Sequence, residues 1–165
     1  MFSQFNTLII HSNSQFNNQI KTYLEDKEYL CNQISQFKEF ADYYENHTYD
    51  CIIIEDEFPR IKTKEFIVQA KLKGQPIIIV LTDTLSPDYL ESLLNAGADD
   101  YLVEPYDLKD LDTKIQSVYK NGILRPRRIY RFKDIVVDTT SRTCSCNGKP
   151  LNLTKNEFKL LTILI

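Results

Sequence analysis

The sequence predicts an α/β protein with a doubly wound, five-stranded parallel sheet, followed by the start of a second, smaller domain. Short unbroken apolar runs recur along roughly the first 120 residues, and amphipathic stretches with helical spacing separate them. After the basic segment Arg125–Arg128 the pattern changes to several short strands. The first two features predict the sheet, and the third predicts the second domain.

The expected strands are short apolar runs of the kind that helices bury on both faces of a parallel sheet. They lie at Thr7–Ile10, Glu28–Ile34, Cys51–Ile54, Pro76–Leu81 and Tyr101–Val103. The third of these runs directly into Glu55, Asp56 and Glu57. Ligands of such sheets bind at the carboxyl ends of the strands, so we expect the functional site around Glu55.

The expected helices alternate with these strands, and several carry start or stop signals. Ser14 is a candidate cap, Ser86–Pro87 places proline in a first turn, and Gly74 and Gly97 are typical terminators. The predicted helices are Ser14–Leu24, Ser35–Tyr44, Thr63–Leu72, Ser86–Ala96 and Leu108–Lys120. Asn121–Gly122 should break the last helix.

Residues after the linker predict a small antiparallel sheet and then a helix. The expected strands are Ile129–Phe132, Ile135–Asp138, Arg142–Cys146 and Leu151–Leu153, with Asn147–Gly148 as a hairpin turn. Thr154 and Glu157 have the spacing of a capping box. The helix that they start is apolar on one face, so this segment is expected to be the front of a larger domain.

Composition is that of an ordinary globular protein, with 42% hydrophobic and 26% charged residues among 165. No membrane span or secretory signal is expected, and four cysteines without such a signal suggest reduced thiols in the cytoplasm. Residues 124–165 hold nine Lys or Arg and three Asp or Glu, although the whole chain has a net charge of −3. The basic second block either faces a polyanion or is a chance cluster of solvated charge.

Two segments resemble a known family. The run Leu94–Tyr106 resembles the end of a two-component response-regulator receiver domain, and Phe132–Asp138 with Asn147–Leu161 resembles the opening of the winged-helix effector of the OmpR/PhoB class. The resemblance implies a flavodoxin-like receiver at 1–121, a linker at 122–128 and an incomplete winged-helix domain at 129–165.

The phosphorylation site implied by the resemblance is altered. Family receivers place two Mg²⁺-binding acids where His11 and Ser12 stand, and the phospho-accepting aspartate, four residues before a proline, corresponds to Glu55. The Ser/Thr position is kept as Thr82, but the lysine position is Glu104. Asp56 is expected to point away, because side chains alternate along a strand.

These changes predict a receiver that is not phosphorylated and has no catalytic residue, metal or other cofactor. Mg²⁺ prefers oxygen ligands, and an acid at Glu104 would repel a phosphoryl group. Glu55 is then either a permanent partial mimic of a phosphate, holding Thr82 and the aromatic switch Tyr101, or an ion-pair partner of His11 in a closed pocket. A transition-metal site at His11, Glu55 and Glu104 is a rarer reading.

The resemblance also implies partners. Family members dimerise through the helix that begins at Ser86, the strand at Tyr101 and the helix at Leu108. The matching dimer-face residues are Leu90, Asp99, Asp100, Asp110 and Lys114. An Asp100–Lys114 cross-pair and apolar contact by Leu90 are expected, with a solvated helix face as the alternative.

Promoter DNA would bind to a recognition helix beyond residue 165, giving a phosphorylation-independent transcription regulator. The alternative is a pseudo-receiver that senses a partner or ligand.

Overall fold

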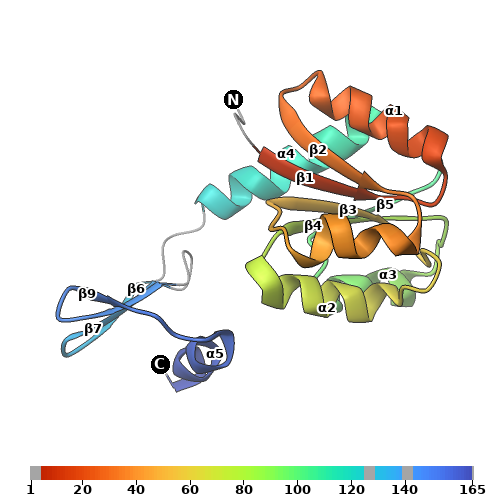
Figure 1. Ribbon diagram of the computed structural model, residues 1–165. Helices are drawn as coiled ribbons and strands as arrows, with labels where there is room; N and C mark the ends of the chain where they lie inside the picture. The colour runs from red at the N-terminus through yellow and green to blue at the C-terminus, as the bar shows by residue number, and fades with distance from the viewer. Residues whose placement is uncertain (1–4, 125–128, 139–142, 165) are drawn as a thin grey trace. The chain divides into compact units, whose positions relative to one another are not determined.

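The computed structural model describes residues 5–124, 129–138 and 143–164. The chain divides into two compact units, Met1–Asn121 and Gly122–Ile165. Figure 1 labels the helices and strands of both units.

The first unit contains the predicted five-stranded parallel sheet. Its strand order is β2-β1-β3-β4-β5, so β1 lies between β2 and β3. Ile10 at the end of β1 pairs with Ile34 on one side and Ile54 on the other, which aligns the carboxyl ends of three strands. The strands are β1 (Phe5–Ile10), β2 (Tyr29–Ile34), β3 (Cys51–Glu55), β4 (Ile77–Thr82) and β5 (Asp100–Val103).

Helices cover both faces of this sheet, which confirms the doubly wound arrangement (Figure 1). Their bounds are α1 (Ser14–Glu25), α2 (Thr63–Gly74), α3 (Pro87–Ala96) and α4 (Leu108–Leu124). Ile20 of α1 and Ile115 of α4 belong to one buried apolar cluster, whereas Ile67 of α2 and Leu93 of α3 belong to another. The cap of α1 is Asn13 rather than the predicted Ser14, because the Asn13 side chain accepts the Phe16 N–H at 3.0 Å.

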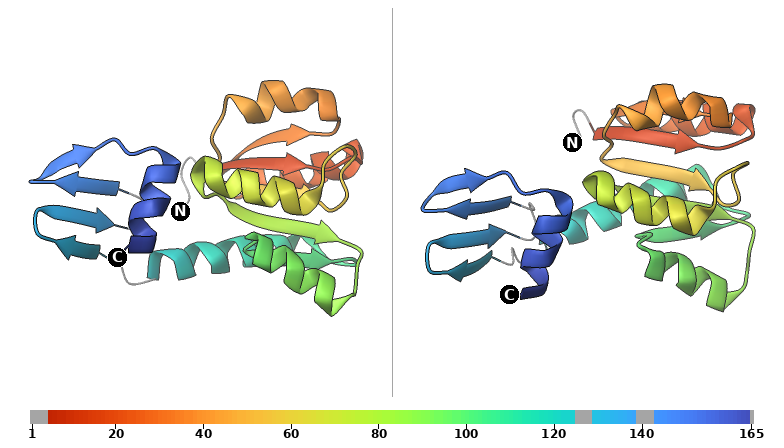
Figure 2. Two further views of the ribbon diagram at one scale, coloured as in Figure 1. Left: turned by 90° about the horizontal axis from the view of Figure 1, so that it is seen from below. Right: turned by 60° about the horizontal axis from the view of Figure 1, so that its bottom comes forward.

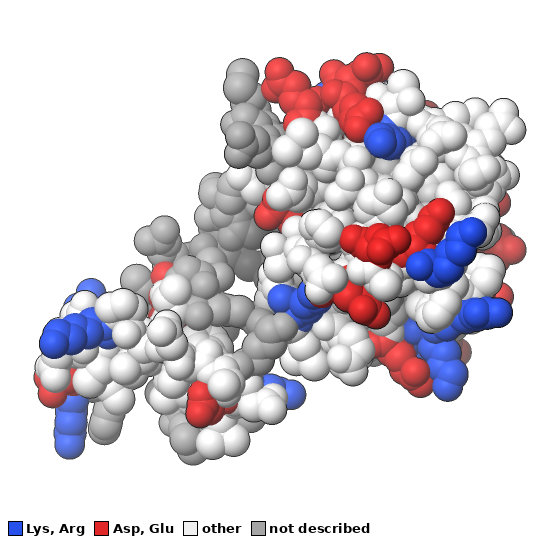
Figure 3. Space-filling view, in the orientation of Figure 1, with Lys and Arg blue, Asp and Glu red and all other residues white. Residues whose placement is uncertain are grey.

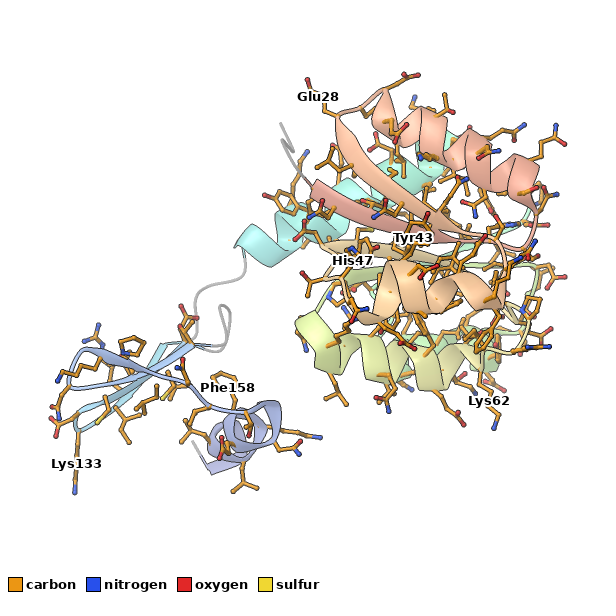
Figure 4. The ribbon with its side chains drawn as sticks, in the orientation of Figure 1. Glu28, Tyr43, His47, Lys62, Lys133 and Phe158 are labelled. Carbon is orange, nitrogen blue, oxygen red and sulfur yellow. The ribbon has the colours of Figure 1, made fainter. Side chains whose placement is uncertain are left out.

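The predicted α-helix at Ser35–Tyr44 is wrong. A short 3₁₀ turn, η1 (Phe37–Glu39), and a π-helical turn, η2 (Ala41–Glu45), take its place. The wide turn lets both Phe40 and Tyr44 contact Phe66 of α2, with ring centroids 6.1 and 5.2 Å apart. Tyr43 lies in η2 and His47 follows it (Figure 4). Aromatic packing against α2 therefore overrides the regular helix that the spacing indicated.

The last helix of the first unit is longer than predicted. α4 continues to Leu124, so Asn121–Gly122 does not break it. Glycine inside a helix costs only about 1 kcal/mol relative to alanine, which the rest of a long helix can offset. The predicted linker 122–128 therefore begins within α4, and its residues 125–128 lie outside the described residues.

The second unit is a four-stranded antiparallel sheet with the order β6-β7-β8-β9, followed by α5 (Figure 2). Asn147 and Gly148 have φ values of 51° and 74°, as the predicted hairpin turn requires. Lys133, at the turn between β6 and β7, points away from the strands (Figure 4). The elements are β6 (Ile129–Phe132), β7 (Ile135–Asp138), β8 (Thr143–Cys146), β9 (Lys149–Leu151) and α5 (Lys155–Leu164).

The start of α5 has the predicted capping box. The Thr154 N–H donates to Glu157 Oε2 at 2.7 Å, and the Glu157 N–H donates to Thr154 Oγ1 at 3.4 Å. The last strand lies at Lys149–Leu151 instead of the predicted Leu151–Leu153, and Arg142 lies outside the described residues. That these elements begin a winged helix stays a prediction.

Acidic side chains gather over the turn between α1 and β2 on the face shown in Figure 3. This turn contains Asp26 and Glu28, next to Glu25 at the end of α1. Within the described ranges, the helices are too short or too polar for any of them to span a bilayer.

Candidate functional site

The predicted pocket residues follow the carboxyl ends of neighbouring strands. His11 follows β1, Glu55 ends β3, and Thr82 ends β4. His11 and Thr82 are only 7% and 4% exposed, whereas the Glu55 side chain is 26% exposed. The strand order brings β1 and β3 side by side at the point where the chain changes direction across the sheet. This is the usual binding edge of an open α/β sheet.

The Glu55 carboxylate is held by Ser12. The Ser12 N–H donates to Glu55 Oε2 at 2.7 Å, and the Ser12 hydroxyl donates to Glu55 Oε1 at 3.0 Å. Because the acceptor is charged, these bonds are stronger than bonds between neutral groups. Both carboxylate oxygens therefore point at the loop between β1 and α1, which they fasten to the end of β3.

His11 lies within ion-pair distance of Glu55, but the predicted pair is charged only if the imidazole is protonated. Its Nδ1 accepts the Asn13 N–H at 3.1 Å, so that nitrogen carries no proton, and it lies 3.9 Å from Glu55 Oε1. Burial lowers the pKa of His11, against the opposing pull of the Glu55 and Glu104 charges. A neutral imidazole packed edge-on against Phe16, with ring centroids 4.9 Å apart, is the arrangement that these contacts favour. Ser12, not His11, closes the pocket over Glu55.

Thr82 is bound to Asp56 rather than to Glu55. The Thr82 hydroxyl donates to Asp56 Oδ2 at 3.0 Å, and a hydroxyl has only one hydrogen to donate. The expectation that Asp56 points away from the pocket residues is therefore wrong. Strand β3 ends at Glu55 and Glu57 has a φ of 56°, so the alternation of side chains stops one residue before Asp56.

Glu104 and Tyr101 lie on the β5 side of the pocket. The Glu104 N–H donates to the Thr82 carbonyl at 2.9 Å, and the Glu104–Pro105 peptide is cis. Glu104 is exposed, and its charge acts on His11. The half-buried ring of Tyr101 packs against the apolar cluster under α3. The predicted pocket residues are thus close in the fold, but their hydrogen bonds divide them between Ser12–Glu55 and Asp56–Thr82.

Two further pocket residues are absent from the sequence predictions. Tyr89 of α3 donates its hydroxyl to Asp56 at 2.8 Å, and burial raises the pKa of Tyr89. Tyr106 lies beside Phe16, with ring centroids 6.2 Å apart, and its buried hydroxyl has no hydrogen-bond partner among the described residues. Burial, with the Glu104 and Glu55 charges, raises the pKa of Tyr106. No spacing rule connects either tyrosine to Glu55, so sequence alone offered no signal for them.

The pocket residues do not fit the Mg²⁺ ion that the resemblance to receivers implies. Among the described residues, no three His, Cys, Asp or Glu side chains are grouped so that they could hold a metal ion. Of the pocket positions at the ends of the first and third strands, only that of Glu55 carries a carboxylate. Ser12 donates a hydrogen bond to each of its two oxygens. Mg²⁺ needs near-octahedral oxygen ligands, which a neutral imidazole and a serine hydroxyl do not provide.

One predicted dimer-face residue is misplaced. Leu90 is 8% exposed and belongs to the buried cluster between the sheet and α3, so it cannot supply an apolar contact to a partner. The reason is helical phase: Leu90 and Leu93 form the stripe of α3 that faces the sheet.

The charged dimer-face residues have partners within the chain. Asp99 Oδ2 lies 2.5 Å from Lys71 Nζ and accepts the Ile78 N–H at 2.8 Å. Lys114 Nζ lies 2.9 Å from Asp100 Oδ2, so this pair is formed inside one chain. Asp110, in the first turn of α4, accepts the N–H of Asp107 at 3.3 Å.

Residues 7–116 match the response regulator receiver domain family. The chain belongs to this family. The receiver is 31% identical over 122 residues to the response regulator ArlR of Staphylococcus saprophyticus, an alignment that covers 73% of this chain and 54% of ArlR. It is 29% identical over 160 residues to ArlR of Staphylococcus epidermidis, covering 96% of this chain and 72% of that relative. The chain thus spans about half the length of the first relative.

Solved structures share the fold. The response regulator DrrB of Thermotoga maritima, described as an OmpR/PhoB homologue, matches with a TM-score of 0.62 at 19% identity, over 98% of this chain and 72% of that one. A two-component response regulator of Clostridium difficile matches with a TM-score of 0.65 at 22% identity, over 71% of this chain and 97% of that one. The first of these likenesses extends over both units of the chain.

Proposed function

We propose that this chain is part of an atypical, cytoplasmic response regulator that controls transcription without being phosphorylated. The observation that carries the proposal is the Glu55 carboxylate, whose two oxygens are taken by Ser12 in place of a metal ion and a phosphoryl group. Glu104 adds a negative charge where a cation is needed to neutralise an incoming phosphoryl group. The relatives named ArlR are themselves response regulators, which supports the regulatory role.

The same contacts favour a closed pocket over a phosphate mimic. A mimic would have to receive the Thr82 hydroxyl, but that hydroxyl donates to Asp56. Glu55 instead turns toward the loop after β1. In this proposal Glu55 is a fixed charge that holds the loop, and the receiver stays in one state.

The proposed partners are a second copy of the chain and promoter DNA. The dimer would use α3, β5 and α4, with the Asp100–Lys114 pair and Asp110 at its edge and without Leu90. Exposed ion pairs contribute only about 0–1 kcal/mol each, so a Lys114→Glu change should weaken the dimer and not abolish it. Sedimentation equilibrium measures this, with Lys21→Glu on α1 as the matched control.

The function is tested with the natural gene product and genomic DNA fragments. Electrophoretic shifts are measured over a range of salt concentrations, with and without acetyl phosphate and Mg²⁺. The proposal expects salt-dependent binding to specific fragments that the phosphodonor does not change. Binding that requires the phosphodonor would contradict phosphorylation independence. Failure to bind any fragment would contradict the role in transcription and favour a pseudo-receiver that binds a protein or ligand.

A further inference from the structure

Asp56 accepts hydrogen bonds from three different hydroxyl groups. Thr63 Oγ1 donates to Asp56 Oδ1 at 2.6 Å, Tyr89 donates to the same oxygen at 2.8 Å, and Thr82 donates to Oδ2 at 3.0 Å. Thr63 and Thr82 are buried, so these hydroxyls have few other groups to bond. A carboxylate that accepts several hydrogen bonds from fixed donors is held firmly in one position.

The donors come from three elements of the first unit. Thr63 begins α2, Thr82 ends β4, and Tyr89 lies in the first turn of α3, while Asp56 itself follows β3. Parallel strands and helices meet at this edge of the sheet, so one carboxylate can join the beginnings of two helices to the ends of two strands. Lys62, just before α2, points outward from this edge (Figure 4).

Further contacts tie the start of α3 to α2. The Lys64 ammonium lies 5.3 Å from the centroid of the Tyr89 ring and 3.4 Å from the Ser92 hydroxyl oxygen. The Ser92 hydroxyl donates to the Tyr89 carbonyl at 2.6 Å. Tyr89 is thus held through its ring, its backbone carbonyl and its hydroxyl.

Thr82 is fixed at both its donor and its acceptor. Its hydroxyl hydrogen goes to Asp56, and its oxygen accepts the Thr84 N–H at 3.1 Å. A ligand at the Glu55 pocket could engage this hydroxyl only after the bond to Asp56 breaks. At the start of the loop between β4 and α3, the Asp56 carboxylate therefore binds the Thr82 hydroxyl. In a receiver that is phosphorylated, a phosphoryl group would bind this hydroxyl instead.

We propose that Asp56 is a positioning residue that locks the start of α3 in one orientation by holding Thr82 and Tyr89. The inference rests on the proposed function, because a lock of this kind is useful in a receiver that no phosphoryl group switches. It adds the residue that fixes α3 and, with it, the face proposed for dimerisation.

Amide hydrogen exchange, measured by mass spectrometry on peptides within 82–96 and on peptides from β1 and α1, tests the lock. Asp56→Asn keeps the shape of the side chain but removes its charge and one of its two acceptor oxygens. We expect exchange in the first turns of α3 to accelerate by about tenfold or more, with β1 and α1 unchanged, because hydrogen bonds to a charged group are lost. Tyr89→Phe should give a smaller acceleration in the same segment. Glu57→Gln, a neighbouring exposed acid, is the matched control and should leave exchange unchanged.

Unchanged α3 exchange in both Asp56→Asn and Tyr89→Phe would overturn the inference. Acceleration spread equally over β1 and α1 would also overturn it, because that result indicates only general destabilisation. The proposed function has a separate test. A phosphoryl adduct on the protein without substitutions would refute that proposal, whatever the exchange data show.

Discussion

The contact between Ser12 and Glu55 makes a quantitative prediction. Ser12→Ala removes the 3.0 Å bond from the serine hydroxyl to Glu55 Oε1 and leaves the 2.7 Å bond from the backbone N–H to Oε2. Glu55→Ala removes both bonds. A double-mutant cycle on the two positions therefore isolates the hydroxyl–carboxylate interaction from other effects of each change.

The magnitude follows from the charge and exposure of the pair. A hydrogen bond to a charged group contributes about 1.5–3 kcal/mol when it is well buried. The Glu55 side chain is 26% exposed and Ser12 is exposed, so solvent screens the interaction. We expect a coupling free energy of about 1 kcal/mol, just below the range of well-buried bonds of this kind.

Urea unfolding of the four proteins in the cycle measures this coupling. With an m-value of about 2 kcal/mol per molar urea, Ser12→Ala should lower the midpoint by about 0.5 M. Ser14→Ala, an exposed serine two residues along, is the matched control and should change the midpoint little. A coupling free energy below about 0.3 kcal/mol, the usual limit of additivity, would refute the claim that Ser12 holds Glu55.

Three other predictions concern His11, Leu90 and Glu157. Because burial lowers the pKa of His11 below its ordinary value of 6.5, the unfolded chain binds a proton more readily, and the free energy of unfolding should fall as pH drops below about 6.5. His11→Gln should reduce this slope, which is up to about 1.4 kcal/mol per pH unit. Leu90→Ala should cost about 2–5 kcal/mol of folding free energy as a buried leucine; a loss of dimer affinity without loss of stability would restore Leu90 to the dimer face. Hydrogen bonds from Thr154 lower the pKa of Glu157, so α5 should lose helical signal as acid protonates that carboxylate, and Glu157→Ala should remove this pH dependence.

Sequence patterns predicted the sheet well because burial on both faces leaves a strong signal. Runs such as Ile52–Ile54 and Ile77–Leu81 are too short for a buried helix and too apolar for a half-exposed strand. The hairpin at Asn147–Gly148 was predictable for a different reason, since few residue pairs tolerate two positive φ values. Local chemistry decides both features.

Features that depend on tertiary contacts were not predictable in this way. The turns of η1 and η2 replace a helix because Phe40 and Tyr44 both pack on Phe66. The alternation rule failed at Asp56 because the strand had already ended, and no local pattern reports that. The pocket positions themselves came from the resemblance, whereas the division of their hydrogen bonds between Ser12 and Asp56 needed the structure.

The central claim is that this receiver does not accept a phosphoryl group. The direct measurement is the intact mass of the protein after incubation with acetyl phosphate and Mg²⁺, with a receiver that keeps its aspartate as the positive control. We expect the mass to stay unchanged, because Ser12 holds Glu55, the described residues form no metal site, and Glu104 repels the phosphoryl group. A gain of about 80 Da, the mass of one phosphoryl group, on Glu55 or Asp56 would contradict the claim.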